Sequence, residues 1–326
     1  MVIHSFAKLN LFLKVINKRP DNYHNLITLF ERISLSDSIT LKNLKHSLIT
    51  VKCSDKSVPQ GPENLCFKAA GLLRDNFAKE KGVEINITKN IPVGAGLGGG
   101  SSNAAAVLLG LNRLWKINLP VKQLVKVAGK VGSDVPFFIY EKPFGLGLGR
   151  GERIKPLGNL NKIKLWHVLV VPKIKVSTPL MYKHWDCVAG LTPLQIAKQK
   201  ASCSKFVTGL TPLQITKQKA SCSKFVTGLT KPVCDVKILT SELAKRSIFL
   251  RSDLFFNSLE QVTARIYPEV KRVKNTLLGL GVSFALMSGS GPSVFSLIAS
   301  RREAVRLARA IKRKYKSWRI YTVSTV

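Results

Sequence analysis

The chain has 326 residues, of which 45% are hydrophobic, and its mean hydropathy of +0.09 is typical of a globular protein with one large domain or two ordinary ones. It holds no apolar run of about 18 residues, which excludes a membrane-spanning helix. Its N-terminus lacks a signal-peptide pattern. We therefore expect a cytoplasmic protein without a membrane partner. The net charge of +34 suits nucleic acid and an anionic small substrate alike, and by itself it decides nothing; because the lysines are dispersed, no nucleic-acid partner is expected despite this charge. The six cysteines form no C-x-x-C pair, which argues against a zinc site or a disulfide framework.

The first half of the chain alternates predicted strands and helices. Apolar residues at every second position from 7 to 15 predict a strand over 5–15 that places Lys8 and Asn10 together on its opposite face. The polar turn at 19–26 follows and contains Tyr23 and His24. The pattern then predicts strands at 27–35 and 37–42, a helix at 63–79, a strand at 83–89 and helices at 101–114 and 120–130.

The second half has a similar mixture. The predicted elements are a glycine-rich hairpin or bulge at 145–154, a buried strand at 164–172, mostly helix over 241–278, a strand–turn–strand at 282–299, a basic helix at 301–314 and a strand at 318–324. Mixed elements of this kind are typical of the α+β class. We therefore predict two domains, 1–157 and 158–326.

The second half also contains a tandem repeat. Residues 190–208 recur at 209–227 with one difference, Ala197 against Thr216. Two copies are too few for a solenoid, in which neighbouring repeats bury a continuous core. We interpret 190–227 as a surface insertion in the second domain.

The stretch "IPVGAGLGGGSSNAAAVLL" (91–109) places a glycine-rich loop directly before a helix. A plain strand-to-helix turn does not need so many glycines. Gly94, Gly96 and Gly99 match the dinucleotide fingerprint, but the acidic residue that this fingerprint needs is missing, because no carboxylate lies between Glu84 and Asp134. A phosphate cradle remains, in which backbone amides and the helix N-terminus approach an anion.

This stretch resembles the glycine–serine ATP loop of the GHMP kinases. "FAKLNLFLKV" (6–15), "RPDNYHNLITLFERISLSDSI" (19–39), "GSDVPFFI" (132–139) and "MSGSGPSVFSL" (287–297) resemble the branch of that family that phosphorylates the 2-hydroxyl of CDP-methylerythritol, a small molecule of the non-mevalonate route to isoprenoid precursors. The resemblance implies an N-terminal domain like that of ribosomal protein S5 and a ferredoxin-like C-terminal domain, with ATP and the acceptor meeting between them. It explains nothing about the repeat.

The resemblance also implies roles for individual residues. It assigns ATP binding to Pro92, Gly94, Gly96, Leu97, Gly98, Gly99, Gly100, Ser101 and Ser102. It assigns acceptor binding to Asn10, Tyr23, His24, Tyr182, Ser288, Gly289, Ser290 and Gly291, with the aromatic residues stacking on the cytosine. Asp134 is implied as the base and Lys8 as its cationic partner, although an isolated aspartate in a turn is more often a helix cap. Mg²⁺ is expected to accompany ATP, without a named protein ligand.

Two alternatives remain open at this point. One is another small-alcohol kinase of the same family, such as homoserine kinase, although the Tyr23–His24 pair favours a cytidine substrate. The other is an RNA-binding protein without catalysis, which leaves the Lys8 and Asp134 motifs unexplained. A monomer or a homodimer is expected.

Overall fold

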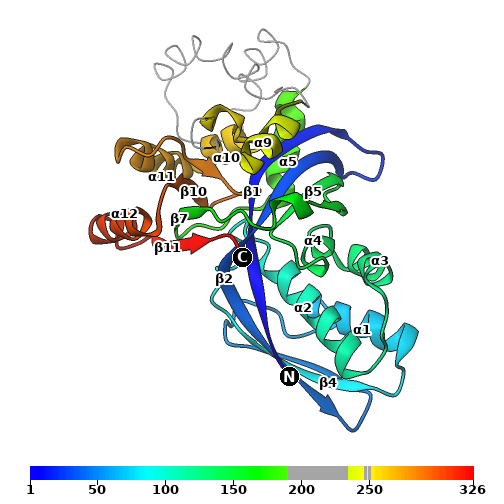
Figure 1. The fold of residues 1–326 in the computed structure, drawn as a ribbon. Coiled ribbons are helices and arrows are strands. Elements are labelled where there is room, and N and C mark those ends of the chain that lie inside the picture. The colour runs from blue at the N-terminus through cyan, green and yellow to red at the C-terminus, as the bar shows by residue number, and fades with distance from the viewer. Residues whose placement is uncertain (190–233, 246–247, 249–250) are drawn as a thin grey trace.

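The structure, a computed structural model, describes residues 1–189, 234–245, 248 and 251–326, so the repeat at 190–227 lies outside the described residues (Figure 1). The strands of the first sheet are β1 (Val2–Lys18), β2 (His24–Leu44), β3 (Ile49–Cys53), β4 (Gly82–Thr88), β5 (Phe144–Gly149), β6 (Arg153–Pro156) and β8 (Phe256–Asn257). Their order is β3-β4-β2-β1-β8, and the β5–β6 hairpin pairs with β2. The hairpin confirms the glycine-rich prediction at 145–154.

One long antiparallel pair, β1 with β2, dominates this sheet. The prediction of two separate strands at 27–35 and 37–42 is wrong, because a single strand runs through both. Opposite Phe6 and Ala7 the register shifts from Ser36 to Ile33, so a β-bulge takes up Ser34 and Leu35 and the strand continues without a break.

Four helices cover one face of the first sheet (Figure 1). They are α1 (Leu65–Phe77), α2 (Gly99–Leu114), α3 (Val121–Val131) and α4 (Val135–Ile139). The first three confirm the predicted helices, with every boundary within two residues of the prediction. The short α4 was not predicted, since a brief apolar run does not distinguish a helix from a strand. Among the described residues no helix is both long and apolar enough to cross a membrane.

The second sheet is antiparallel in the order β11-β7-β10-β9. Its strands are β7 (Trp166–Val171), β9 (Leu286–Met287), β10 (Val294–Ile298) and β11 (Arg319–Ser324). The α-helices in the described part of this half are α5 (Thr178–Ala189), α9 (Cys234–Ala244), α10 (Glu260–Ile266), α11 (Pro268–Gly279) and α12 (Arg301–Lys314). The prediction of mostly helix over 241–278 is wrong around residues 256–257, where β8 pairs with β1 of the first sheet. The predicted boundary at 157/158 lies between β6 and β7, and the chain crosses back at β8.

Apolar packing holds the two halves together. One cluster includes Leu9 and Leu11 of β1, Leu169 of β7 and Phe295 of β10, all fully buried. Because α2 also packs on β1, this strand is covered on both faces, and Lys8, predicted on a polar face, is 4% exposed. Burial of its aliphatic stem leaves the ammonium group in need of a polar partner.

Candidate active site

The glycine loop between β4 and α2 requires glycine for its conformation. Gly94, Gly96 and Gly98 have positive φ angles of 66°, 73° and 67°, a region that other residues rarely adopt. A β-carbon at Gly96 would lie 2.3 Å from the Ser288 carbonyl oxygen, so a side chain is excluded there by contact as well. Gly98 caps α2 without any side-chain hydrogen bond, which leaves the first amides of the helix free of a capping side chain. These amides form an anion-binding end.

The predicted ATP residues divide into an exposed edge and a buried support. Gly94 and Gly100 are exposed and Ser101 is half-buried, so they line the accessible edge of the loop. Pro92, Leu97 and Ser102 are buried. Leu97 packs in the core between the sheets, and its carbonyl oxygen accepts a hydrogen bond of 2.9 Å from the Lys8 amide.

Asp37, a residue that the sequence analysis did not select, fixes the start of this loop. Its fully buried carboxylate accepts hydrogen bonds from the amides of Asn90 and Ile91 at 2.7 and 2.8 Å and from Asn103 Nδ2 of α2 at 2.8 Å, and it pairs with Lys89. The carboxylate therefore joins the loop to the first turns of α2. Such a connection holds the loop rigid when a ligand binds.

Lys8 and Asp134 form an ion pair, as the family resemblance implied. Lys8 Nζ lies 3.6 Å from Asp134 Oδ2, and the two side chains are 5% and 34% exposed. Burial lowers the pKa of the Lys8 ammonium, and the nearby Asp134 carboxylate offsets part of that effect. Asp134 precedes α4 but caps none of its amides, so the alternative of a structural helix cap has no support in the geometry.

Asn10 connects this pair to the second half of the chain, because its backbone amide donates a hydrogen bond of 3.3 Å to Ser288 Oγ. Its Oδ1 accepts a hydrogen bond of 2.5 Å from Lys8 Nζ, and its Nδ2 donates to Thr28 Oγ1 at 2.7 Å. Thr28 Oγ1 in turn donates its single proton to the Phe12 carbonyl oxygen at 2.8 Å. Toward Asn10 the hydroxyl can therefore only accept a hydrogen bond, which comes from the side-chain NH₂ group of Asn10. Thr28 thereby orients Asn10 with its oxygen toward Lys8, a role that the sequence analysis missed.

The turn at 288–291 lies against the glycine loop. Ser288 Oγ donates to the Gly96 carbonyl oxygen at 3.1 Å, and a β-carbon at Gly289 would lie 3.4 Å from Lys8 Nζ. Asn257, which was not predicted, donates both amide protons to this turn, to the carbonyl oxygens of Met287 at 2.7 Å and Gly289 at 2.8 Å. The structure thus brings the two glycine motifs together beside Lys8.

A second group of predicted residues gathers at the junction of β2 and α5. The His24 ring stacks on Tyr182 with centroids 4.8 Å apart, and its Nε2 lies 2.6 Å from Asp186 Oδ1. Asp186 also pairs with Lys18 at 2.9 Å. Burial raises the pKa of this carboxyl, but the hydrogen bonds from His24 and Lys18 outweigh that effect and lower it. Asp186 was not predicted, although it lies four residues after Tyr182 on one helix face.

Tyr23 differs from His24 in its exposure. Its ring is 52% exposed, and the Arg150 guanidinium lies 4.7 Å from the ring centroid. Tyr182 and Asp134 are close enough for the carboxylate charge to add to the burial effect that raises the pKa of the tyrosine. α5, which carries Tyr182, also contacts the turn at 288–291 beside Lys8, since Thr178 Oγ1 lies 2.7 Å from Ser290 Oγ, so the aromatic group and the Lys8–Asp134 pair belong to one region of the molecule.

Comparison with known proteins identifies the family. The profile of the GHMP kinases N terminal domain matches residues 64–142, and the profile of the GHMP kinases C terminal domain matches residues 240–317. A 4-diphosphocytidyl-2-C-methyl-D-erythritol kinase of Moorella thermoacetica is 36% identical over 315 residues, which cover 97% of this chain and 96% of the relative.

Solved structures agree with this result. The crystal structure of a 4-(cytidine 5'-diphospho)-2C-methyl-D-erythritol kinase matches with a TM-score of 0.68 and 31% identity over 100% of both chains. A homoserine kinase from Cytophaga hutchinsonii matches with a TM-score of 0.60 and 20% identity over 100% of this chain and 95% of that one, and this likeness shows the fold alone. The two-domain α+β class predicted from the sequence is confirmed. The chain belongs to the GHMP kinase family.

Proposed function

We propose that this protein transfers the γ-phosphoryl group of ATP to the 2-hydroxyl of 4-diphosphocytidyl-2-C-methyl-D-erythritol, in the non-mevalonate route to isoprenoid precursors. Relatives of that name align over nearly the whole chain. The observation that carries the chemistry is the pairing of buried Lys8 with the more accessible Asp134. In this arrangement an acidic group that can take a proton is held beside a fixed positive charge.

The proposed reaction uses three parts of the site. The glycine loop and the N-terminus of α2 hold the phosphates with backbone amides. Asp134 accepts the proton of the acceptor hydroxyl. The hydroxyl oxygen forms a bond to the γ-phosphorus, and the bond between the γ-phosphorus and the bridging oxygen of ADP breaks. Lys8 stabilises the charge that develops around this centre, and Asn10 holds Lys8 in place. Tyr23, His24 and Tyr182 bind the cytosine, and the turn at 288–291 lines the acceptor side.

Magnesium enters this proposal as part of the nucleotide substrate. Among the described residues there is no group of three or more histidine, cysteine, aspartate or glutamate side chains that could hold a metal by itself. One accessible carboxylate and the serine hydroxyls at the start of α2 fit an ion held mainly by phosphate oxygens and water. When bound, Mg²⁺ would neutralise phosphate charge. We place the reaction in the cytoplasm, where thiols stay reduced, and the described cysteines Cys53, Cys66 and Cys187 are free.

A direct kinase assay tests the proposal. ADP formation is measured with ATP and either CDP-methylerythritol or homoserine as the acceptor, and the phosphorylated product is identified by mass spectrometry. We expect turnover with the cytidine substrate alone. A rate with homoserine that equals or exceeds it, or no turnover with either acceptor, would contradict the proposal.

A further inference from the structure

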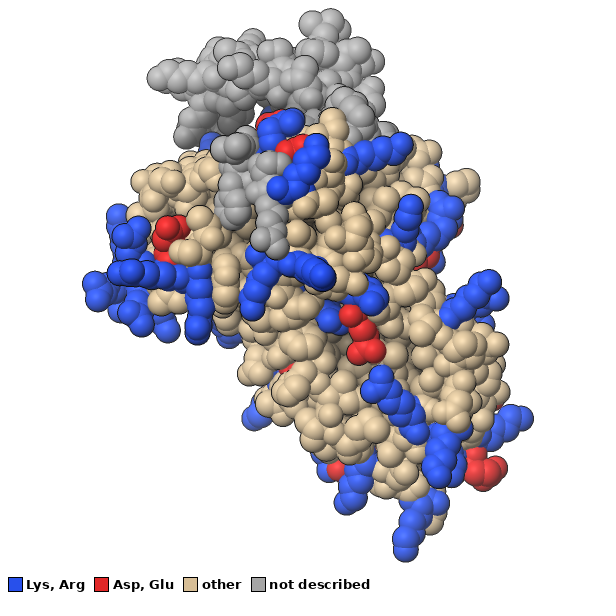
Figure 2. Space-filling model, in the orientation of Figure 1, with Lys and Arg blue, Asp and Glu red and all other residues tan. Residues whose placement is uncertain are grey.

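One strongly basic surface of this protein lies along α12 and the residues that follow it. Every lysine and arginine between residues 301 and 319 is exposed, and Glu303 is the one acidic residue in that span. Figure 2 shows blue side chains gathered at the left edge of the molecule, where Figure 1 places α12. The stretch 301–319 holds nine of the 52 lysines and arginines of the protein, and most of them lie on the basic helix that the sequence predicted at 301–314.

Four arginines of α12 form a single line. Arg302, Arg306, Arg309 and Arg313 are separated by four, three and four residues, so they fall on one helix face and extend over about 16 Å at 1.5 Å per residue. The opposite face of the helix buries Ala304 and Ile311, and α12 packs on β7 and β11. We call the four exposed residues the arginine row.

The charges of the arginine row are not neutralised within the protein. None of the four guanidinium groups forms an ion pair with a carboxylate among the described residues. Like charges three or four residues apart on one helix face repel each other and destabilise the helix. A bound polyanion would remove this repulsion and release its own counterions.

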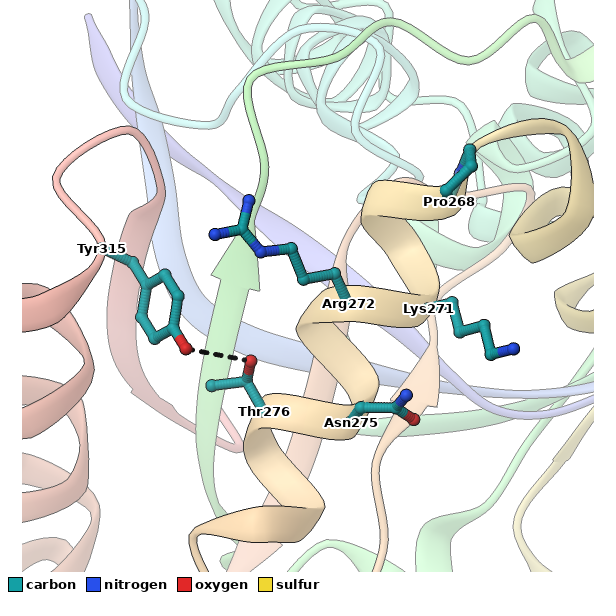
Figure 3. Close-up of a pocket in the computed structure, with 6 residues that line it drawn as sticks. All are labelled: Pro268, Lys271, Arg272, Asn275, Thr276 and Tyr315. Atoms are coloured by element: carbon teal, nitrogen blue, oxygen red, sulfur yellow. Dashed lines mark hydrogen bonds between the residues drawn. The ribbon is translucent and has the colours of Figure 1, made fainter. Parts of the chain in front are cut away.

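A groove beside α12 adds groups of a different kind. The cavity, of about 460 Å³, lies between α11 and the chain after α12 and is lined by Arg272, Asn275, Thr276 and Tyr315 among others (Figure 3). Tyr315 stacks on Trp318 at 4.1 Å, and Arg272 lies 5.6 Å from the Tyr315 ring. An aromatic platform next to arginines is the combination that binds single-stranded nucleic acid.

We propose that the arginine row and this groove bind single-stranded RNA, as a function separate from catalysis. An anionic membrane fits the surface less well, because a helix that lies on a membrane inserts large apolar side chains. None of the exposed large hydrophobic residues lies between 281 and 326. The backbone of RNA would pair with the row, and a base would stack at Tyr315.

Two triple variants with the same loss of charge test the proposal. The first is Arg306→Gln/Arg309→Gln/Arg313→Gln. The control is Lys122→Gln/Lys126→Gln/Lys130→Gln on α3, where the three lysines are also exposed and four residues apart. Fluorescence anisotropy with a labelled, unstructured single-stranded RNA is recorded over a range of KCl concentrations. Kinase activity, expected to be unchanged in both variants, shows that each is folded.

We expect the RNA affinity of the wild type to fall as the salt concentration rises. In the arginine-row variant, the slope of the logarithm of the association constant against the logarithm of the salt concentration should decrease in magnitude by about 2, because each of the three lost phosphate contacts contributes about 0.7. The lysine variant should keep the wild-type slope. Equal losses in both variants would mean that the overall charge, and not this surface, attracts RNA, and would overturn the proposal. Absence of wild-type binding to RNA would also overturn it, and binding to phosphatidylserine vesicles in that case would identify an anionic membrane as the partner of this surface.

Discussion

The two ends of the proposed active site are built in different ways. The transfer end, made of the glycine loop, the turn at 288–291 and the Lys8–Asp134 pair, is formed by backbone groups around one buried cation. The base end, made of Tyr23, His24, Tyr182 and Asp186, is formed by side chains from two elements that lie far apart in the sequence. Shape is therefore fixed by excluded volume at the first end and by stacking and hydrogen bonds at the second.

This difference separates the expected effects of mutation. At the transfer end, a small change alters the position of reacting groups, which affects turnover strongly. At the base end, loss of one ring weakens binding of the acceptor equally in the ground state and in the transition state, which raises its KM and leaves kcat nearly unchanged. The predictions below test this separation, beginning with the largest effect.

Removal of the proposed base should have the largest effect. Asp134→Asn keeps the shape of the side chain but cannot accept the hydroxyl proton, so kcat is expected to fall by about 10²–10⁴-fold. ATP affinity, measured by calorimetry, should change little, since the backbone of the glycine loop holds the nucleotide. Near-normal turnover combined with a much lower melting temperature would show instead that Asp134 is structural.

Two glycines of the loop provide a matched pair for the next test. Gly96→Ala would place its β-carbon 2.3 Å from the Ser288 carbonyl oxygen, whereas a β-carbon at Gly94 has no neighbour within 4 Å, and both residues have positive φ. Both alanines carry conformational strain of about 1–2 kcal/mol. Only Gly96→Ala also displaces the turn at 288–291, so we expect kcat/KM to fall by roughly 10²-fold more than in Gly94→Ala. Similar losses in the two variants would show that contact with Ser288 is unimportant.

Tyr23→Ala should have a smaller effect, confined to the acceptor. Loss of a stacking ring is worth about 1–3 kcal/mol per base, so the KM for CDP-methylerythritol is expected to rise about tenfold or more while the KM for ATP stays nearly constant. Asp186→Asn should act in the same direction, because it weakens the contact that orients His24. Steady-state kinetics with each substrate varied in turn distinguishes this from a general loss of structure, which would change both KM values.

The same two ends differ in how well the sequence predicts them. The transfer end lies in short motifs: Gly96, Ser288 and Asp134 each stand in a contiguous stretch whose composition already indicates its chemistry. Asp186 was missed because its partner His24 is 162 residues away, and only the docking of α5 on β2 brings them together. Asn257 was missed for a similar reason, since its stretch was predicted as helix and its role depends on pairing between β8 and β1.

The pH dependence of stability provides a finer test of the Lys8 environment. Because the pKa of Lys8 is below its usual value of 10.5 in the folded protein, the unfolded chain binds more protons between the two values. The free energy of unfolding attributable to Lys8 should therefore increase as pH rises through that interval. Urea unfolding of the wild type and of Lys8→Met at a series of alkaline pH values measures this contribution. The difference between their free energies of unfolding should change with pH. If the two free energies instead vary with pH in parallel, the burial of a charged ammonium is contradicted.

Deletion of one copy of the repeat should have the smallest effect at either end. Residues 209–227 duplicate 190–208 except at one position, so the remaining copy retains nearly every side chain that the pair provides. Shortening the connection between α5 and α9 by this amount changes the closure entropy by less than about 0.6 kcal/mol, since that is the change for a doubling of length. We expect unchanged KM for both substrates and a melting temperature close to that of the wild type. A selective rise in the KM for CDP-methylerythritol would instead connect the repeat to the base end, because α5 carries Tyr182 and Asp186 and ends at Ala189, immediately before the first copy.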